Sequence, residues 1–339
     1  MNRTIGALIG KKTAGWSQEW WKSEHIVVYP AQIQELDNFS KFIEEYALTG
    51  HIPAKPLLGD DDALITLGSC FSRELRFFLG RYGLSAGNFV VPSGLNNTFA
   101  LVDFITWATT GKTTARAYRY DRNEDGNIIE WMPDLEQREY SEAFSNAGAI
   151  LLTLGLSEVW EDRETGRVFW RGVPEEIYND GRHRFRLSTV EENVANIETM
   201  ISAVREVNES APIVFALSPV PLKATFRGQS CITADCVSKS ILRVALDSVI
   251  SDGRKGVYYF PSFEIVRWLG CNMSFPSFGA EDGTTNHVSR FFVINILKAF
   301  VKSFYLPEAR ERFLAGLRGD GVPDDTSRFF VLAAGKKLS

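Results

Sequence analysis

Hydrophobic and polar positions along the chain predict strands that alternate with helices. Short, mostly apolar runs of the length of a buried strand begin at Ala63, Phe89, Ala149, Ile213 and Val257. Continuous apolar runs are typical of parallel strands that are covered on both faces. Because helical stretches separate the runs, the pattern predicts a three-layer α/β/α sandwich with a central parallel sheet.

The helical stretches carry apolar residues three or four positions apart. After the first run, this stripe consists of Phe71, Leu75, Phe78, Leu79 and Tyr82. A longer stripe ends at Val207, and a capping box of Ser188 and Glu191 predicts its start. The remaining helices are expected over residues 30–46, 98–110, 237–246 and 291–304, and from 306 onward.

Two segments interrupt this alternation and predict hairpin insertions. Residues 116–132 combine an E-D-G-N turn with short β-prone flanks, and residues 159–170 place β-prone arms around E-T-G. The chain then divides into a lead-in with a helix at 1–60, an α/β domain at 61–305, and a C-terminal helix with a polar tail at 306–339.

Composition and charge narrow the classes of function. Of 339 residues, 45% are hydrophobic and 23% charged, as in ordinary globular proteins. The formal net charge of −5 argues against nucleic acid as a partner, because such binders usually carry a basic face. The best candidate for a local basic patch is G-R-H-R-F-R at 181–186. No stretch reaches the roughly 18 apolar residues of a membrane span, so none is expected.

Cysteine and histidine usage predicts a reducing compartment without a metal site. The four cysteines are Cys70, Cys231, Cys236 and Cys271. They are few for this length, and the N-terminus lacks the apolar core of a signal peptide, so we expect a cytoplasmic protein. With four histidines, neither a metal nor a tightly bound cofactor is expected. Neither the composition nor the hydrophobic periodicity of the sequence indicates an oligomeric state.

The stretch from Ala63 to Arg73 holds the strongest candidate chemistry. Gly68 ends the predicted strand and permits a sharp turn, and the hydroxyl of Ser69 and the thiol of Cys70 follow directly before a helix. Unpaired N–H groups at a helix N-terminus lower the pKa of a thiol and stabilise an oxyanion. These residue types predict a nucleophile for acyl groups at Cys70, with Ser69 as the fallback.

The run G-S-C-F-S, Gly68 to Ser72, resembles the signature of the GSCFA family. That family is similar to the SGNH (GDSL-like) hydrolases and acyltransferases, which are flavodoxin-like α/β sandwiches. Their first block is G-D-S with serine as the nucleophile, so the alignment on glycine places Cys70 at the nucleophile position and Ser69 at the aspartate. Further resemblances, among them S-P-V, S-K-S and Y-F-P segments, extend over roughly Leu64 to Ala299.

The resemblance implies an oxyanion hole after the second and third strands. P-S-G-L-N-N places Gly94 where SGNH enzymes donate a backbone N–H, and Asn97 near an asparagine of the family. The later G-x-N-D or G-x-N-E block corresponds to Gly155 through Glu158, with Ser157 in place of asparagine. A serine hydroxyl still donates, over a shorter reach. The alternative is that these residues only form turns and cap helices.

A general base is implied by E-D-G-T-T-N-H, residues 281–287. The family places D-x-x-H before its last helix, where the histidine takes the proton of the nucleophile and the aspartate orients it. Here His287 matches the base, but Thr284 stands three positions before it. Asp282, five positions before, is the candidate to orient the imidazole.

These assignments predict acyl-ester chemistry, preferably O-acyl transfer to a glycan or sugar precursor. The small-molecule donor would be an acyl-CoA, and the acceptor a carbohydrate that stacks on Trp160. Lys223, Arg227 and Lys239 are candidates to meet a phosphate or carboxylate. One alternative is a carboxylesterase or acetylesterase of the same fold. Another is a non-catalytic carbohydrate-binding or assembly protein, which the departures at 157 and 284 favour.

Overall fold

The computed structural model describes residues 29–30, 38–68, 70–87, 91–92, 94–131, 137–251, 253–273 and 276–322. At its centre lies a sheet of four strands in the order β1-β5-β9-β10, and all neighbours are parallel. The strands are β1 (Leu64–Gly68), β5 (Ala149–Leu154), β9 (Ile213–Leu217) and β10 (Val257–Phe260). Their carboxyl ends therefore share one edge of the sheet, the carboxyl edge, where open α/β sheets build their sites.

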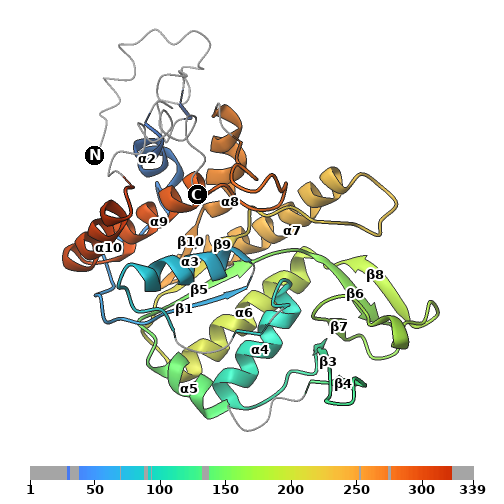
Figure 1. The fold of residues 1–339 in the computed structure, drawn as a ribbon. Coiled ribbons are helices and arrows are strands. Elements are labelled where there is room, and N and C mark those ends of the chain that lie inside the picture. Colours follow the sequence, from blue (N-terminus) through green and yellow to red (C-terminus); the bar gives the residue numbers. More distant parts are fainter. Residues whose placement is uncertain are drawn as a thin grey trace.

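Helices cover both faces of the sheet, which confirms the predicted three layers. One face carries α4 (Thr98–Thr110), α5 (Gln137–Ser145), α6 (Val190–Val207) and α7 (Cys231–Ile250). The other face carries α2 (Phe39–Phe42), α3 (Cys70–Arg81), α9 (Arg290–Phe304) and α10 (Pro307–Gly319). Figure 1 shows α4, α5 and α6 on one side of the sheet and α9 and α10 on the other.

The apolar runs are continuous because both faces of each strand are buried. In β5, Ile150 and Leu152 point into the core beneath α4 and α6, whereas Ala149 and Leu151 point into the core beneath α3 and α9. Successive side chains of a strand alternate between the faces, so neither face can be polar here. Five short helical segments complete the described fold: η3 (Ile43–Ala47), η4 (Glu175–Ile177), α8 (Ser262–Glu264), η5 (Ile265–Leu269) and η6 (Gly270–Asn272).

Two small sheets correspond to the predicted hairpin insertions. One is an antiparallel pair, β3 (Tyr120–Arg122) and β4 (Ile128–Glu130). The other has the order β2-β7-β6-β8. Its strands are β2 (Ala117–Tyr118), β6 (Glu158–Asp162), β7 (Val168–Phe169) and β8 (His183–Leu187). Since β6 begins four residues after β5 ends, this sheet lies beside the carboxyl edge (Figure 1).

One predicted strand lies outside the described residues, and one predicted helix cap is wrong. The strand expected from Phe89 falls on residues 88–90, which lie outside the described residues, although Ala86 forms a parallel bridge with Leu64 of β1. The capping box predicted at Ser188 and Glu191 is wrong by one residue. The N-cap of α6 is Thr189, which exchanges hydrogen bonds with Glu192.

Candidate functional site

The turn after β1 is fixed by close packing against β5. Gly68 has φ of 110°, and a Cβ at this position would lie 2.0 Å from the carbonyl oxygen of Thr153. Only glycine adopts this backbone conformation without strain, and only glycine leaves room for the neighbouring strand. The predicted sharp turn is therefore required by the approach of two strands.

Buried hydroxyl groups fasten the first turn of α3 to the sheet. Ser72 Oγ donates to the carbonyl oxygen of Leu67 over 2.7 Å and lies 2.7 Å from Thr153 Oγ1. Thr66 Oγ1 donates to the carbonyl oxygen of Ser72 over 3.1 Å. All these hydrogen bonds lie beside Cys70, the first residue of α3. Ser69 lies outside the described residues, and of Cys70 the structure describes the backbone.

His287 and Asp282 form a pair in the loop before α9. His287 Nδ1 lies 2.5 Å from Asp282 Oδ2, and Asp282 Oδ1 accepts hydrogen bonds from the N–H and the hydroxyl of Thr284. Hydrogen bonds from Thr284, then from His287, lower the pKa of Asp282 to about 2. The carboxylate therefore stays ionised at neutral pH. The pair engages Nδ1, so Nε2 is the ring nitrogen that is left for the predicted role of base.

The loop that carries this pair is tied to the carboxyl edge. The N–H of Gly279 donates to the carbonyl oxygen of His287, and Phe278 forms an antiparallel bridge with Val288. Arg267 lies over the ring of Phe278, 5.3 Å from its centroid, and donates to the carbonyl oxygen of Pro219, directly after β9. The candidate nucleophile and the candidate base therefore belong to the same edge of the sheet.

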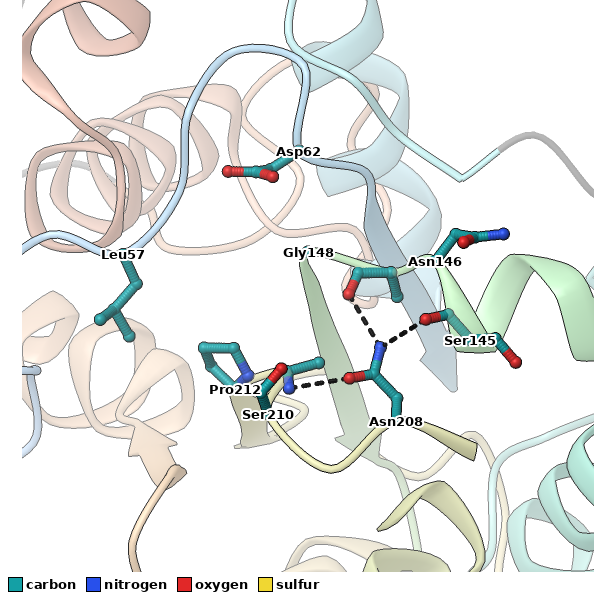
Figure 2. A pocket seen from close by; sticks show the side chains of 10 residues that line it. Leu57, Asp62, Ser145, Asn146, Gly148, Asn208, Ser210 and Pro212 are labelled. Carbon is teal, nitrogen blue, oxygen red and sulfur yellow. Dashed lines mark hydrogen bonds between the residues drawn. The ribbon is translucent and has the colours of Figure 1, made fainter. Parts of the chain in front are cut away.

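A cavity of about 440 Å³ opens between this loop and η5 and η6. Its walls include Val266, Arg267, Cys271, Pro276, Phe278 and Thr285. A second cavity, of about 430 Å³, lies at the opposite edge, where the strands begin (Figure 2). There Asn208 donates to the carbonyl oxygens of Phe144, Ser145 and Ala147. Asn208 therefore holds the loop that lines this cavity. The cavity lies at the other end of β1 from the Gly68 turn.

The turns predicted to form the oxyanion hole are joined to each other. Gly94 has φ of 103°, and its carbonyl oxygen accepts a hydrogen bond from the N–H of Asn96. The carbonyl oxygen of Asn96 accepts hydrogen bonds from the N–H groups of Gly155 and Leu156, both over 3.0 Å. The N–H of Gly155 is thus engaged inside the fold, whereas the role of Gly94 stays a prediction.

Asn97 and Ser157 have partners within the protein. Asn97 caps α4 by accepting from the N–H of Ala100, and its amide donates to the carbonyl oxygens of Phe169 and Trp170. Ser157 is fully buried; its N–H donates to Ser238 Oγ over 2.9 Å, and its hydroxyl lies 3.3 Å from the same atom. Their roles in an oxyanion hole stay predictions. An oxyanion would have to compete with these partners for the side chains of Asn97 and Ser157.

A buried lysine lies beneath these turns. Lys239 Nζ donates to the carbonyl oxygen of Gly155 over 2.5 Å, and burial lowers the pKa of Lys239 to about 7. The expectation that Lys239 meets a phosphate or carboxylate is wrong, because its side chain is enclosed by the protein. The S-K-S segment indicated a residue of interest here, but not the direction in which it points.

The candidate substrate-binding residues gather around one loop. Trp160 packs edge-to-face on Phe226, with centroids 5.2 Å apart, and Phe226 is 65% exposed. The neighbouring Arg227 reaches Glu158, with Nη1 3.8 Å from Oε1. Lys223 is exposed on the same loop. The loop with Phe226 and Arg227 therefore packs on Trp160 of β6 and covers the start of that strand.

Glu158 was not among the predicted site residues. Its side chain is buried, which raises its pKa, and Oε1 accepts a hydrogen bond from Thr225. Among the described residues, Glu158 Oε2 and Arg227 Nη1 are buried without a hydrogen-bond partner. The sequence did offer a signal for this residue, because Glu158 occupies the acidic position of the G-x-N-D or G-x-N-E block.

The arginines of the predicted basic patch are paired with acidic side chains. Arg182 binds Asp162 and Arg184 binds Glu161, each with a shortest distance of 2.6 Å, while Arg186 bridges Glu161 and Glu192. This charge neutralisation gives no support to a nucleic-acid interface at residues 181–186. Within the described ranges, no helix is long and apolar enough to cross a membrane.

The fold and these groups define a three-layer α/β protein with a candidate nucleophile at a strand–helix turn and a histidine oriented by a carboxylate. The chain belongs to the GSCFA family, whose model matches residues 63–275. The match includes Cys70 and ends before His287. No curated protein sequence matches.

One similar solved structure is the salicylyl-acyltransferase SsfX3 from a tetracycline biosynthetic pathway. The similarity has 11% sequence identity and a TM-score of 0.33, and it covers 78% of this chain. This chain spans 57% of the length of that structure.

Proposed function

We propose that this protein transfers acyl groups through a thioester on Cys70, with His287 as the base and Asp282 as the residue that orients it. The observation that carries the proposal is the His287–Asp282 pair, in a loop tied to the edge of the sheet where α3 begins. Membership of the GSCFA family supports the assignment of Cys70. Ser69 is the fallback nucleophile.

The chemistry follows from the residue types. His287 Nε2 takes the thiol proton of Cys70, and the thiolate attacks the carbonyl carbon of an acyl thioester such as an acyl-CoA. The oxyanion is stabilised by N–H groups at the start of α3 and by Gly94. The carbon–sulfur bond of the donor breaks, and its thiol leaves with the proton from His287. An acceptor hydroxyl then gives its proton to His287 and takes the acyl group, which restores the Cys70 thiol.

The acceptor is a glycan or sugar precursor, and the loop with Lys223 and Arg227 binds it beside Trp160. A supply of acyl-CoA accords with a cytoplasmic location. If water is the acceptor, the same steps make the protein a carboxylesterase or acetylesterase, and the 65% exposure of His287 favours access of water. The complete burial of Ser157 favours the third candidate, a carbohydrate-binding or assembly protein without catalysis.

Mass spectrometry after incubation with acetyl-CoA or an activated acetyl ester tests the proposal. We expect an acyl adduct on the peptide that contains Cys70, its loss in Cys70→Ala, and no loss in the control Cys231→Ala. Release of CoA that requires an added sugar indicates a transferase, and release in water alone indicates an esterase. Absence of an adduct, together with equal alkylation rates of Cys70 and Cys271, would contradict catalysis.

A further inference from the structure

Two consecutive residues of α7 hold both ends of the segment that follows β5. Lys239 Nζ donates to the carbonyl oxygen of Gly155 over 2.5 Å, and Ser238 Oγ accepts a hydrogen bond from the N–H of Ser157 over 2.9 Å. The side chain of Lys239 is only 3% exposed, and Ser238 is fully buried. One turn of α7 therefore fixes residues 155–157 from inside the protein.

The charge of Lys239 is poorly compensated at this place. The acidic group that raises the pKa of Lys239 is Asp235, one turn earlier on α7. The carboxylate of Asp235 already accepts the N–H of Leu222 and pairs with Arg267 over 2.7 Å. Arg267 itself disfavours a second positive charge at Lys239. Because a buried ammonium with a neutral carbonyl partner costs stability, a methionine of similar length would be the cheaper choice for packing alone.

The hydrogen bonds of this segment continue to the predicted oxyanion turn. The N–H groups of Gly155 and Leu156 donate to the carbonyl oxygen of Asn96, whose own N–H donates to the carbonyl oxygen of Gly94. A Cβ on Gly155 would lie 2.6 Å from the carbonyl oxygen of Asn96, so the two turns are also in close steric contact. The position of Gly94 therefore depends on that of residues 155–157.

We propose that Lys239 is a positioning residue, which fixes residues 155–157 and, through Asn96, the Gly94 turn at the carboxyl edge. Lys239 touches no substrate in this assignment. Its amino group donates a hydrogen bond that holds the carbonyl oxygen of Gly155 inside the protein, and this directs the adjoining N–H groups toward Asn96. The structural part of the inference stands on these contacts, and its kinetic consequence rests on the proposed function.

Hydrogen exchange in Lys239→Met tests the structural part. We expect the amides of Gly155 and Leu156 to exchange about tenfold faster than in the wild type, because the hydrogen bond that holds the carbonyl oxygen of Gly155 is lost. The matched control is Lys298→Met, which removes a buried lysine from α9 on the other face of the sheet and leaves this exchange unchanged. Unchanged exchange in Lys239→Met would overturn the proposal.

Acylation kinetics test the consequence. We expect the rate of Cys70 acylation at saturating donor to fall about tenfold in Lys239→Met, with unchanged KM and a melting temperature no lower than the wild type. A fall in melting temperature that accompanies the loss of rate would assign Lys239 a merely structural role and overturn positioning. If wild-type Cys70 forms no adduct, the proposed function fails, while the exchange experiment still decides whether Lys239 holds the turn.

Discussion

The two halves of the candidate site are built in opposite ways. On the nucleophile side, the start of α3 is held by buried neutral groups, and Thr66, Ser72 and Thr153 are all at most 3% exposed. On the base side, His287 and Asp282 lie on an exposed loop and are joined by a charge-assisted hydrogen bond. The nucleophile is therefore positioned by packing, whereas the base is positioned by charge. Stability and activity should therefore respond separately to changes in the two halves.

The largest effect is expected from Gly68→Ala on the nucleophile side. The new Cβ would lie 2.0 Å from the carbonyl oxygen of Thr153, at a φ of 110°. We expect a loss of more than about 3 kcal/mol in the free energy of unfolding, because two strands must separate. Urea unfolding monitored by circular dichroism measures it.

The control for this change is Gly166→Ala. Gly166 also has a positive φ, of 71°, but no atom lies within 4 Å of a Cβ placed there. Only the strain of the backbone remains, at about 1 kcal/mol. Equal losses in the two variants would show that the close approach of β5 does not constrain the turn after β1.

Asp282→Asn should impair the function of His287 as a base without unfolding the protein. The side chain of Asp282 is 43% exposed, so we expect little change in stability, but acylation of Cys70 should slow about a hundredfold because the imidazole loses its orienting charge. Stopped-flow measurement of acylation gives the rate. Glu281→Gln, in the same loop, should keep it.

The pH dependence of Asp282 follows from its depressed pKa of about 2. A carboxyl group whose folded pKa lies below its unfolded value stabilises the fold above the unfolded value, and this contribution is lost as pH falls from about 4 to 2. Acylation above pH 5 should therefore show no titration of this group. A rate that rises with the deprotonation of Asp282 near pH 5 would contradict the pairing with His287.

Ser72→Ala should have a smaller effect, confined to the nucleophile side. The change removes a buried hydroxyl that bonds the carbonyl oxygen of Leu67 and the hydroxyl of Thr153, at a cost of about 1.5 kcal/mol. Thermal unfolding measures the cost. Ser303→Ala removes a hydroxyl that bonds only within its own helix, and it should cost under about 0.5 kcal/mol. Equal costs would refute the bracing role of Ser72.

The sequence predicts well what short-range periodicity determines. The expected helix over 98–110 is observed as α4 (Thr98–Thr110), and the apolar runs from Ala63 and Ala149 become β1 and β5. These elements follow from local spacing and from the burial of both faces of the sheet. The proximity of Asp282 to His287, five residues apart, could likewise be anticipated.

Contacts between distant elements could not be predicted. S-T-V-E-E contains two overlapping capping frames, and Thr189 takes the cap because the hydroxyl of Ser188 donates to the carbonyl oxygen of Ser157, 31 residues away. The direction of Lys239 has the same cause, since only the folded chain places Gly155 under α7. A sequence assigns charge to a residue, but burial of that charge depends on tertiary packing.

The smallest expected effect is the dependence of stability on pH contributed by Lys239. Burial, opposed by Asp235 and reinforced by Arg267, lowers the pKa of Lys239 to about 7, well below that of an unfolded lysine. The unfolded chain then binds a proton that the folded chain lacks, so stability rises with pH between about 7 and 10. This group should add about 1 kcal/mol to the free energy of unfolding between pH 7 and pH 8. Urea unfolding of the wild type and of Lys239→Met at both pH values measures the difference. An equal rise in the two proteins would show that Lys239 keeps its proton in the folded protein, and that a buried charge beneath residues 155–157 is as well tolerated as the exposed charge of Asp282.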